Sequence, residues 1–207
     1  MAAGSPTPTV ARRPVGRPPR HTLDELLALV VAEFNTRGYD ATSMEDLARA
    51  TGLTKSSLYH HVASKEELLR LAVARGVDAL FDVLDEPGAT AGPALGRLEH
   101  VVRRSVDVLV GQLPYVTLLL RVRGNTAAER EALERRRAFD RRLTALVQAA
   151  VDEGDVRADL DPALVTRLLF GAVNSIVEWY RPRGEHDAAQ VADTLVAVVL
   201  GGLRPRG

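Results

Sequence analysis

Hydrophobic residues recur at intervals of three and four along most of this chain, and they rarely alternate with a period of two. That spacing puts apolar side chains on one face of an α-helix rather than on one face of a strand. Capping residues, glycines and prolines mark where each helix begins and ends. The expected helices cover residues 22–38, 43–52, 54–61, 64–85, 93–112, 114–124, 126–153, 161–180 and 187–200. The pattern therefore predicts an all-α fold.

The stretch from residue 43 to residue 65 has the pattern of a helix-turn-helix. Ser43 and Thr54 stand where N-caps belong, and Gly52 stands at a turn that favours positive φ. Leu58 and Val62 give the second helix its inward face. Its other faces carry hydrogen-bond donors and no acid: Lys55, Ser56, Ser57, Tyr59, His60 and His61. Phosphates accept hydrogen bonds and cannot donate them, so this helix is expected to face a nucleic acid.

The next helix is expected to begin at Ser64, in a capping box with Glu67. This arrangement leaves Lys65 at a helix N-terminus, where backbone amides and an ammonium group would form an anion site.

The segment G-L-T-K-S-S-L-Y-H-H-V-A-S-K-E-E-L, together with the preceding F-N-T-R-G-Y-D-A-T-S-M-E-D-L-A, resembles the tetracycline-repressor (TetR) family of bacterial regulators. The resemblance implies an all-helical dimer that binds operator DNA and is released by a small ligand. Two residues depart from the family pattern: Val62 replaces a frequent Phe, and Glu45 stands where some members carry a basic base-reading residue. The second departure leaves the half-site sequence open.

The recognition helix, residues 55–61, is expected to enter the major groove of double-stranded operator DNA, with two half-sites about 34 to 36 Å apart or a multiple of that. Lys55, Ser56 and Ser57 are the expected base contacts, and Glu45 is a candidate acceptor for a cytosine amino group. The expected phosphate contacts are Thr42, Ser43, Thr54, Tyr59, His60, His61 and Lys65.

Residues 1–20 form a basic, proline-rich arm that is too polar to fold alone. Its V-G-R-P-P-R segment resembles the core of an AT-hook, which would place Arg17 and Arg20 in a minor groove. A solvated tail with incidental charge is the alternative. Residues 21–64 are then the three-helix DNA-binding domain, and residues 65–207 are a larger C-terminal helical bundle for ligand binding and dimerisation.

The last two long helices are apolar on more than one face, so they need partners on two sides. From the pattern alone, a buried core pair and a dimer interface are equally good readings. The family resemblance implies a homodimer through these two helices.

A ligand pocket is expected between the middle helices, where polar and aromatic groups interrupt apolar stretches. The candidate lining residues are Tyr115, Leu119, Arg121, Arg123, Phe139, Asn174, Glu178 and Trp179. Taken singly, each has an ordinary explanation as a core or surface residue. The segment G-A-V-N-S-I-V-E-W-Y-R-P is similar to the C-terminal segments of TetR relatives that sense acyl-CoA compounds, so an acyl-CoA is a candidate effector.

Composition narrows the function further. The 207-residue chain has a formal net charge of zero, so any attraction to DNA must be local. It has no cysteine, which excludes a disulfide framework, a thiolate nucleophile and Cys-ligated zinc. No apolar run reaches about 18 residues, the length that would span a bilayer. The N-terminus lacks the apolar segment of a secretory signal. A cytoplasmic protein without membrane contact is expected.

Catalytic motifs such as G-x-S-x-G, the P-loop and H-E-x-x-H are absent from the sequence. No catalytic residue, metal or cofactor is therefore expected. The expected function is a transcriptional regulator, a repressor that a small molecule releases from a palindromic operator. The alternative is a small-molecule-binding or enzymatic helical bundle with a vestigial DNA reader.

Overall fold

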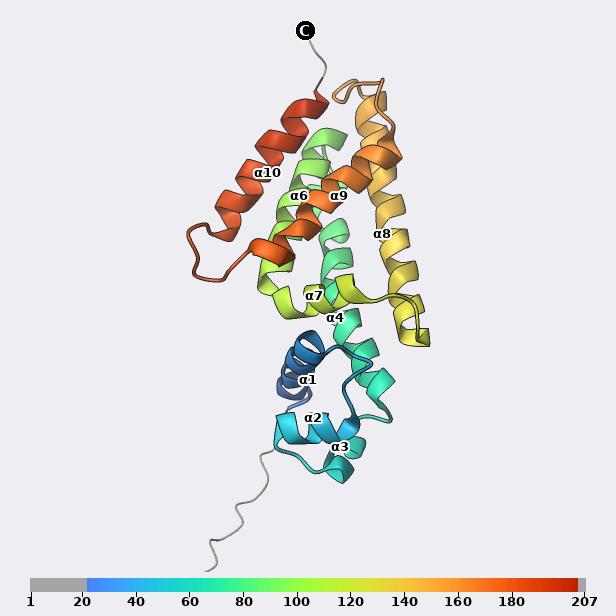
Figure 1. Cartoon of the computed structure of the whole chain (residues 1–207). Coiled ribbons are helices and arrows are strands. Elements are labelled where there is room, and N and C mark those ends of the chain that lie inside the picture. Colours follow the sequence, from blue (N-terminus) through green and yellow to red (C-terminus); the bar gives the residue numbers. More distant parts are fainter. Residues whose placement is uncertain (1–21, 205–207) are drawn as a thin grey trace, which may run out of the picture.

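The computed structural model describes residues 22–204, and every regular element within that range is a helix (Figure 1). The helices are α1 (Leu23–Arg37), α2 (Met44–Thr51), α3 (Lys55–His61), α4 (Lys65–Asp85), α5 (Pro87–Thr90), α6 (Ala94–Gly111), α7 (Leu113–Arg121), α8 (Ala127–Asp152), α9 (Pro162–Trp179) and α10 (Ala188–Leu203). The all-α prediction is confirmed for these residues. The short α5 was not predicted, since no helix was expected between residues 85 and 93.

Capping residues fix the boundaries of the first helices. Thr22 forms a complete capping box with Glu25 at the start of α1. Gly52 ends α2 in the left-handed conformation, with φ of 69°. The capping box expected at α4 is only half formed. Ser64 Oγ accepts from the backbone N–H of Glu67, but the Glu67 carboxylate turns to Arg70 instead of returning to the cap.

Two hydrophobic cores lie along the molecule, and α4 runs through both (Figure 1). The first core joins α1, α2, α3, the first half of α4, α7 and the start of α8. The second joins the end of α4 with α6, α8, α9 and α10. Phe81 of α4 packs against both. The first core thus includes residues on both sides of residue 64. The domain boundary expected at that residue stays a prediction.

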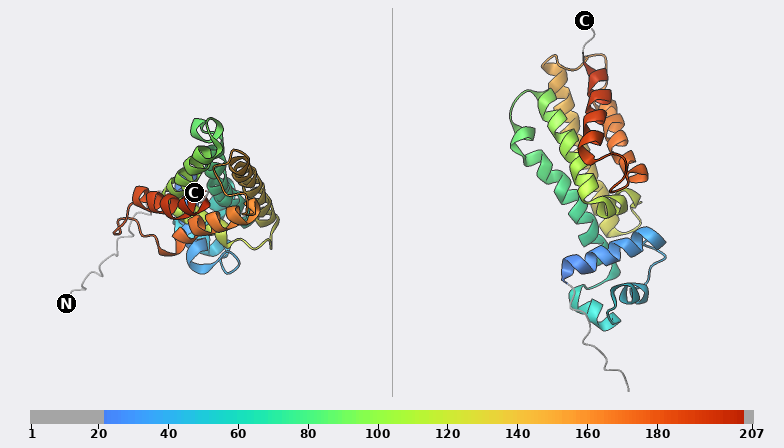
Figure 2. Two further views of the ribbon diagram at one scale, coloured as in Figure 1. Left: turned by 90° about the horizontal axis from the view of Figure 1, so that it is seen from above. Right: turned by 90° about the vertical axis from the view of Figure 1, so that its left-hand side faces the viewer.

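The molecule is elongated, with α1 to α3 at one end and the end of α10 at the other (Figure 2). Polar links tie α4 to α8 along this long axis. The Glu66 carboxylate accepts from the backbone N–H of Ala128 at 2.9 Å. Further along, three ion pairs connect the two helices: Arg70–Glu131, Asp78–Arg135 and Asp85–Arg142.

Among residues 22–204, no helix combines the length and the apolar character that crossing a membrane requires.

Candidate nucleic-acid interface and ligand cavity

Helix α3 is held by one cap and two buried residues. Thr54 Oγ1 accepts from the backbone N–H of Ser57 at 3.1 Å, which fixes the first turn. Leu58 is fully buried and Val62, just after the helix, is 5 % exposed. The rest of the helix faces outward, and even the Tyr59 ring is 47 % exposed. The structure therefore presents a short helix whose outer surface consists of hydrogen-bond donors.

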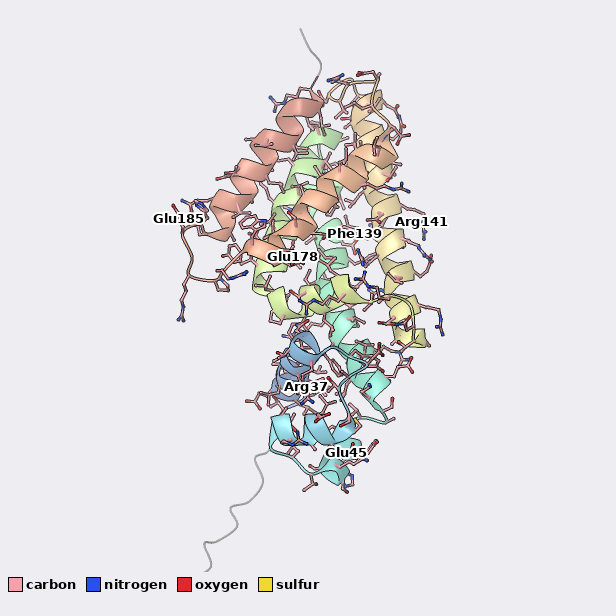
Figure 3. All side chains as sticks on the ribbon, in the orientation of Figure 1. Arg37, Glu45, Phe139, Arg141, Glu178 and Glu185 are labelled. Carbon is pink, nitrogen blue, oxygen red and sulfur yellow. The ribbon has the colours of Figure 1, made fainter. Side chains whose placement is uncertain are left out.

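Glu45 of α2 and Lys55 of α3 meet on this outer surface at the α2–α3 end of the molecule (Figure 3). The Lys55 ammonium donates to the Glu45 carboxylate, and both side chains remain about half exposed. The hydrogen bond from Lys55 lowers the pKa of Glu45, and the same hydrogen bond raises the pKa of Lys55. Both groups are therefore charged in the free protein.

Ser43 and Asp46 form a closed hydrogen-bonded pair at the start of α2. Ser43 donates to Asp46 Oδ2 from its hydroxyl at 2.7 Å and from its backbone N–H at 3.0 Å. Its Oγ in turn accepts from the backbone N–H of Asp46. These bonds, with help from Arg37 and Arg49, lower the pKa of Asp46 to about 2. The Ser43 hydroxyl proton is used internally, so it is not available to a phosphate in this conformation.

Two further residues expected to hold phosphates have internal partners instead. Thr42 is 1 % exposed, and its hydroxyl donates to the carbonyl of Gly38 at 2.7 Å. The Lys65 ammonium donates to the carbonyls of Tyr39 and Thr42, both at 2.9 Å, and lies 4.1 Å from the centre of the Tyr39 ring. Lys65 therefore braces the loop between α1 and α2 with two of its three ammonium donors, and its expected contact with a phosphate stays a prediction. Arg17 and Arg20 lie outside the described residues.

A cavity of about 220 Å³ lies between α4, α7, α8 and α9. Its apolar part includes the edge-to-face pairs Phe81–Phe139 and Phe139–Phe170, with ring centres 5.8 and 5.5 Å apart. The lining residues are Val77, Leu80, Phe81, Val116, Leu119, Leu120, Arg136, Phe139, Asp140, Arg167, Phe170, Gly171 and Asn174. Three residues expected at a ligand pocket, Leu119, Phe139 and Asn174, are brought together here (Figure 3 labels Phe139).

The other five expected pocket residues do not line this cavity. Tyr115 is buried in the first core, beneath the Arg75 guanidinium. Arg121 donates to the carbonyl of Asn35, on the opposite side of α7 from the cavity-lining residues. Arg123 and Glu178 are exposed, and Trp179 lines a different groove. Each lies on a helix or loop that was placed correctly, but on another face of it.

Three charged residues of the cavity, Arg136, Asp140 and Arg167, were not among the pocket residues expected from the sequence. Burial lowers the pKa of the Arg136 guanidinium, and burial raises the pKa of the Asp140 carboxyl. Among residues 22–204, the side chains of Arg136, Asp140 and Arg167 form no hydrogen bond and no ion pair within 4 Å, although the charges of the two arginines act on Asp140 at longer range. Arg136 and Asp140 lie four residues apart on α8, with Phe139 between them, and this spacing resembles a solvated helix face.

A second, open cavity of about 390 Å³ adjoins the first and shares Asp140 and Arg167 with it. Its other lining residues are Arg137, Arg141, Thr144, Ala163 and Thr166. We call the first cavity the inner chamber and the second the vestibule. The inner chamber is mostly apolar, whereas the vestibule is cationic, with Arg141 on the outer part of α8 (Figure 3).

Helices α9 and α10 expose an apolar face. Leu164, Leu168, Trp179 and Val198 are 54, 67, 50 and 71 % exposed. Between the two helices lies a groove of about 430 Å³ lined by Trp179, Val198 and neighbouring residues. Large apolar side chains gathered on one surface are typical of an association site.

Comparisons with known proteins agree with this architecture. Residues 26–72 match the model of the "Bacterial regulatory proteins, tetR family", and residues 91–203 match the "Tetracyclin repressor-like, C-terminal domain". The HTH-type transcriptional repressor KstR2 of Mycobacterium tuberculosis is 32 % identical over 194 residues, which cover 88 % of this chain and 93 % of the relative.

Solved structures give the same result. SCO3833, a TetR-family member from Streptomyces coelicolor, is 56 % identical with a TM-score of 0.83, covering 92 % of this chain and 94 % of that one. AibR in complex with isovaleryl coenzyme A and operator DNA is 25 % identical with a TM-score of 0.74, covering 84 and 95 %. The resemblance stated from residues 34–68 is confirmed.

Proposed function

This chain belongs to the TetR family of bacterial transcriptional regulators, and from that premise we propose that it is a homodimeric cytoplasmic repressor released from DNA by an acyl-CoA. Its function as a DNA-binding regulator follows from the family and from its repressor relatives. We assign it no catalytic role. The observation that carries the DNA-binding proposal is the donor surface of α3, because a capped, core-anchored helix displays it outward.

In the proposed complex α3 lies in the major groove. Lys55, Ser56 and Ser57 are near its N-terminus, the part that contacts base edges in helix-turn-helix proteins. Thr54 uses its oxygen as a cap acceptor, so its hydroxyl proton remains free for a phosphate. Tyr59, His60 and His61 are exposed and supply further donors. Thr42 and Ser43 are left out of this set because their hydroxyl donors are used internally, and Lys65 is left out because two of its three ammonium donors already bind backbone carbonyls.

A second copy of the chain is the proposed partner of the α9–α10 face. The exposed Leu168, Trp179 and Val198 side chains would be removed from water in a symmetric interface, which stabilises association. In the proposed dimer the twofold axis passes through this face parallel to the long axis of the molecule, so that both copies of α3 lie at the same end of the assembly. Two copies of α3 then read two half-sites, which is why a palindromic operator is proposed.

The shape and charge of the two cavities support an acyl-CoA as the effector. The inner chamber is smaller than the about 300–1,000 Å³ typical of ligand pockets, so it suits an acyl group and leaves the rest of the molecule outside. The vestibule carries Arg137 and Arg141, which share the exposed Glu134 carboxylate, together with Arg167, and guanidinium groups suit phosphate groups. The structural neighbour AibR binds isovaleryl coenzyme A.

Helix α7 is the proposed route from ligand to DNA. One of its faces lines the inner chamber through Val116, Leu119 and Leu120. Its other side holds α1, because Asn35 donates to the carbonyl of Pro114 at 2.8 Å and Arg121 donates to the carbonyl of Asn35 at 2.7 Å. A ligand that displaces α7 therefore tilts α1, and a coupling of about 1–3 kcal/mol changes DNA affinity about 5- to 150-fold.

The test has two stages. Duplexes selected from random DNA by the purified full chain are expected to contain a palindrome, bound by a dimer in sedimentation analysis. Calorimetry with short-chain acyl-CoAs, coenzyme A alone and the free acids follows, with release of the selected duplex as the second measurement. Absence of any selected sequence would refute the regulator. Binding of free acids, with no heat from any thioester, would refute the acyl-CoA while leaving the regulator intact.

A further inference from the structure

The outer surface of α2 and α3, which is proposed to meet DNA, carries a carboxylate, Glu45, in contact with the ammonium group of Lys55. Lys55 is the only Lys or Arg of α3, and its ammonium is hydrogen-bonded to Glu45 from the first turn of α2. Both side chains are exposed on the surface proposed to meet DNA, so the pair is not needed to neutralise a charge buried within the protein. The negative charge of Glu45 would be repelled by the phosphates of DNA, so its presence on this surface needs an explanation.

The chemistry of the major groove limits what the Glu45 carboxylate can bind. Phosphate oxygens only accept hydrogen bonds, so its favourable partners are the amino groups of cytosine and adenine. The Lys55 ammonium has the opposite requirement, and guanine offers it two acceptors, O6 and N7, on one edge. In a G·C pair, the guanine O6 and the cytosine N4 are joined by a base-pair hydrogen bond of about 2.9 Å. A carboxylate and an ammonium already in contact match that donor–acceptor spacing.

We propose that Glu45 and Lys55 read one G·C base pair as a unit, with Lys55 donating to guanine and Glu45 accepting from the amino group of the paired cytosine. This inference rests on the proposed operator binding. The pairing also discourages Lys55 from moving to a phosphate, because that movement would leave Glu45 facing the backbone without its cation. Lys55 is thereby directed to a base.

The experiment compares sequence selection by the full chain and by Glu45→Gln, Lys55→Ala and the double variant. The wild-type chain is expected to select a G·C pair at one position of each half-site. Each single variant is expected to lose discrimination at that same position, about 5- to 150-fold for the loss of a good paired contact. The double variant should lose no more than the larger single loss, because the two residues act together. Both side chains are exposed, so folding is expected to be unchanged, and Glu45→Ala provides a second variant.

The control is Glu99→Gln, which removes a surface carboxylate that is also paired with one cation, but on α6. It should leave both affinity and sequence preference unchanged. The inference is overturned if Glu45→Gln tightens binding to every duplex equally, since Glu45 would then only repel phosphates. It is also overturned if the two single variants relax different positions, or if the shared position is A·T. If the wild-type chain selects no sequence at all, the proposed function itself fails.

Discussion

In α2, the Asp46 carboxylate accepts hydrogen bonds from the side chain and backbone of Ser43, and its pKa falls to about 2. In α8, the Asp140 carboxylate has no hydrogen bond within the described residues, and burial raises its pKa. The ionised form of an aspartate is thus stabilised at the DNA-binding end, in Asp46, and destabilised in the cavity, in Asp140.

The two regions therefore differ in whether their polar groups are paired within the protein. Polar groups of α2 and of the loop before it are paired within the protein, so this end is preorganised before DNA arrives. The side chains of Arg136, Asp140 and Arg167 have no hydrogen bond or ion pair among residues 22–204, and Asp140 and Arg167 are exposed to solvent, so these charges are open to an outside partner.

The largest expected effect tests whether the DNA-binding end is rigid because of its core. Leu58→Ala removes a fully buried side chain beneath α3 and should lower the free energy of unfolding by about 2–5 kcal/mol. Urea unfolding measures the change, and operator affinity should fall with it. Leu29→Ala in α1, where the side chain is 37 % exposed, is the matched control and should cost much less. Equal losses for the two variants would contradict this account of α3.

The next prediction concerns the unpaired cations of the cavity. Arg136→Met keeps most of the side-chain volume and removes the guanidinium, so affinity for an acyl-CoA should fall by about 1.5–3 kcal/mol, the usual contribution of a hydrogen bond to a charged group. Calorimetry measures the loss. Arg130→Met, an exposed residue near the start of α8, should leave ligand affinity unchanged. If Arg136→Met bound the acyl-CoA as tightly as the wild type, the inner chamber would not be the site where the effector binds.

Asp46→Asn tests the paired carboxylate through pH. The folded-state pKa of Asp46 lies near 2, below its ordinary 3.8, so its contribution to stability is complete above about pH 4 and is lost as the pH falls towards 2. The variant should therefore melt below the wild type at pH 7, and the two melting temperatures should converge near pH 2. Parallel curves across this range would mean that Ser43 does not stabilise the ionised carboxylate.

The smallest expected effect has the opposite sign. The pKa of Asp140 is raised above its ordinary 3.8, so ionised Asp140 opposes folding at neutral pH, and this cost disappears as the pH falls below 3.8. Asp140→Asn should accordingly be as stable as the wild type or slightly more stable at pH 7, with the difference shrinking in acid. Thermal melts from pH 7 to pH 3 measure it. A variant clearly less stable at pH 7 would show that Asp140 has a favourable partner.

The DNA-binding end was predictable from sequence because its determinants are local. Thr54, Gly52 and Leu58 act on residues a few positions away, and the helix boundaries they predicted agree with the structure. The internal hydrogen bonds of the Thr42 and Ser43 hydroxyls are also local, to Gly38 and Asp46, but those of Lys65 are not. Lys65 reaches back to Tyr39 and Thr42, and no periodicity in the sequence reports a contact across more than 20 residues.

The cavity could not be predicted in the same way, because α8 and α9 meet there only through tertiary packing. Asp140 and Arg167 come from different helices, and either alone has the pattern of a solvated surface residue. Tyr115 and Arg121 were assigned to the pocket because they interrupt an apolar stretch, but α7 is in contact on two sides. The spacing of apolar residues predicted the helix, and only the packing decided which of its faces lines the cavity.

Because α7 completes the first core, the DNA-binding end is not a detachable module. Leu118, Leu119 and Val122 cover apolar side chains of α1 and α4 that would otherwise face water. A chimera that grafts residues 22–86 onto a foreign regulator must therefore import a surface equivalent to α7, or it will expose an aggregation-prone patch. Exchange of DNA specificity between such regulators is accordingly easier by substitution within α2 and α3 than by recombination of whole domains.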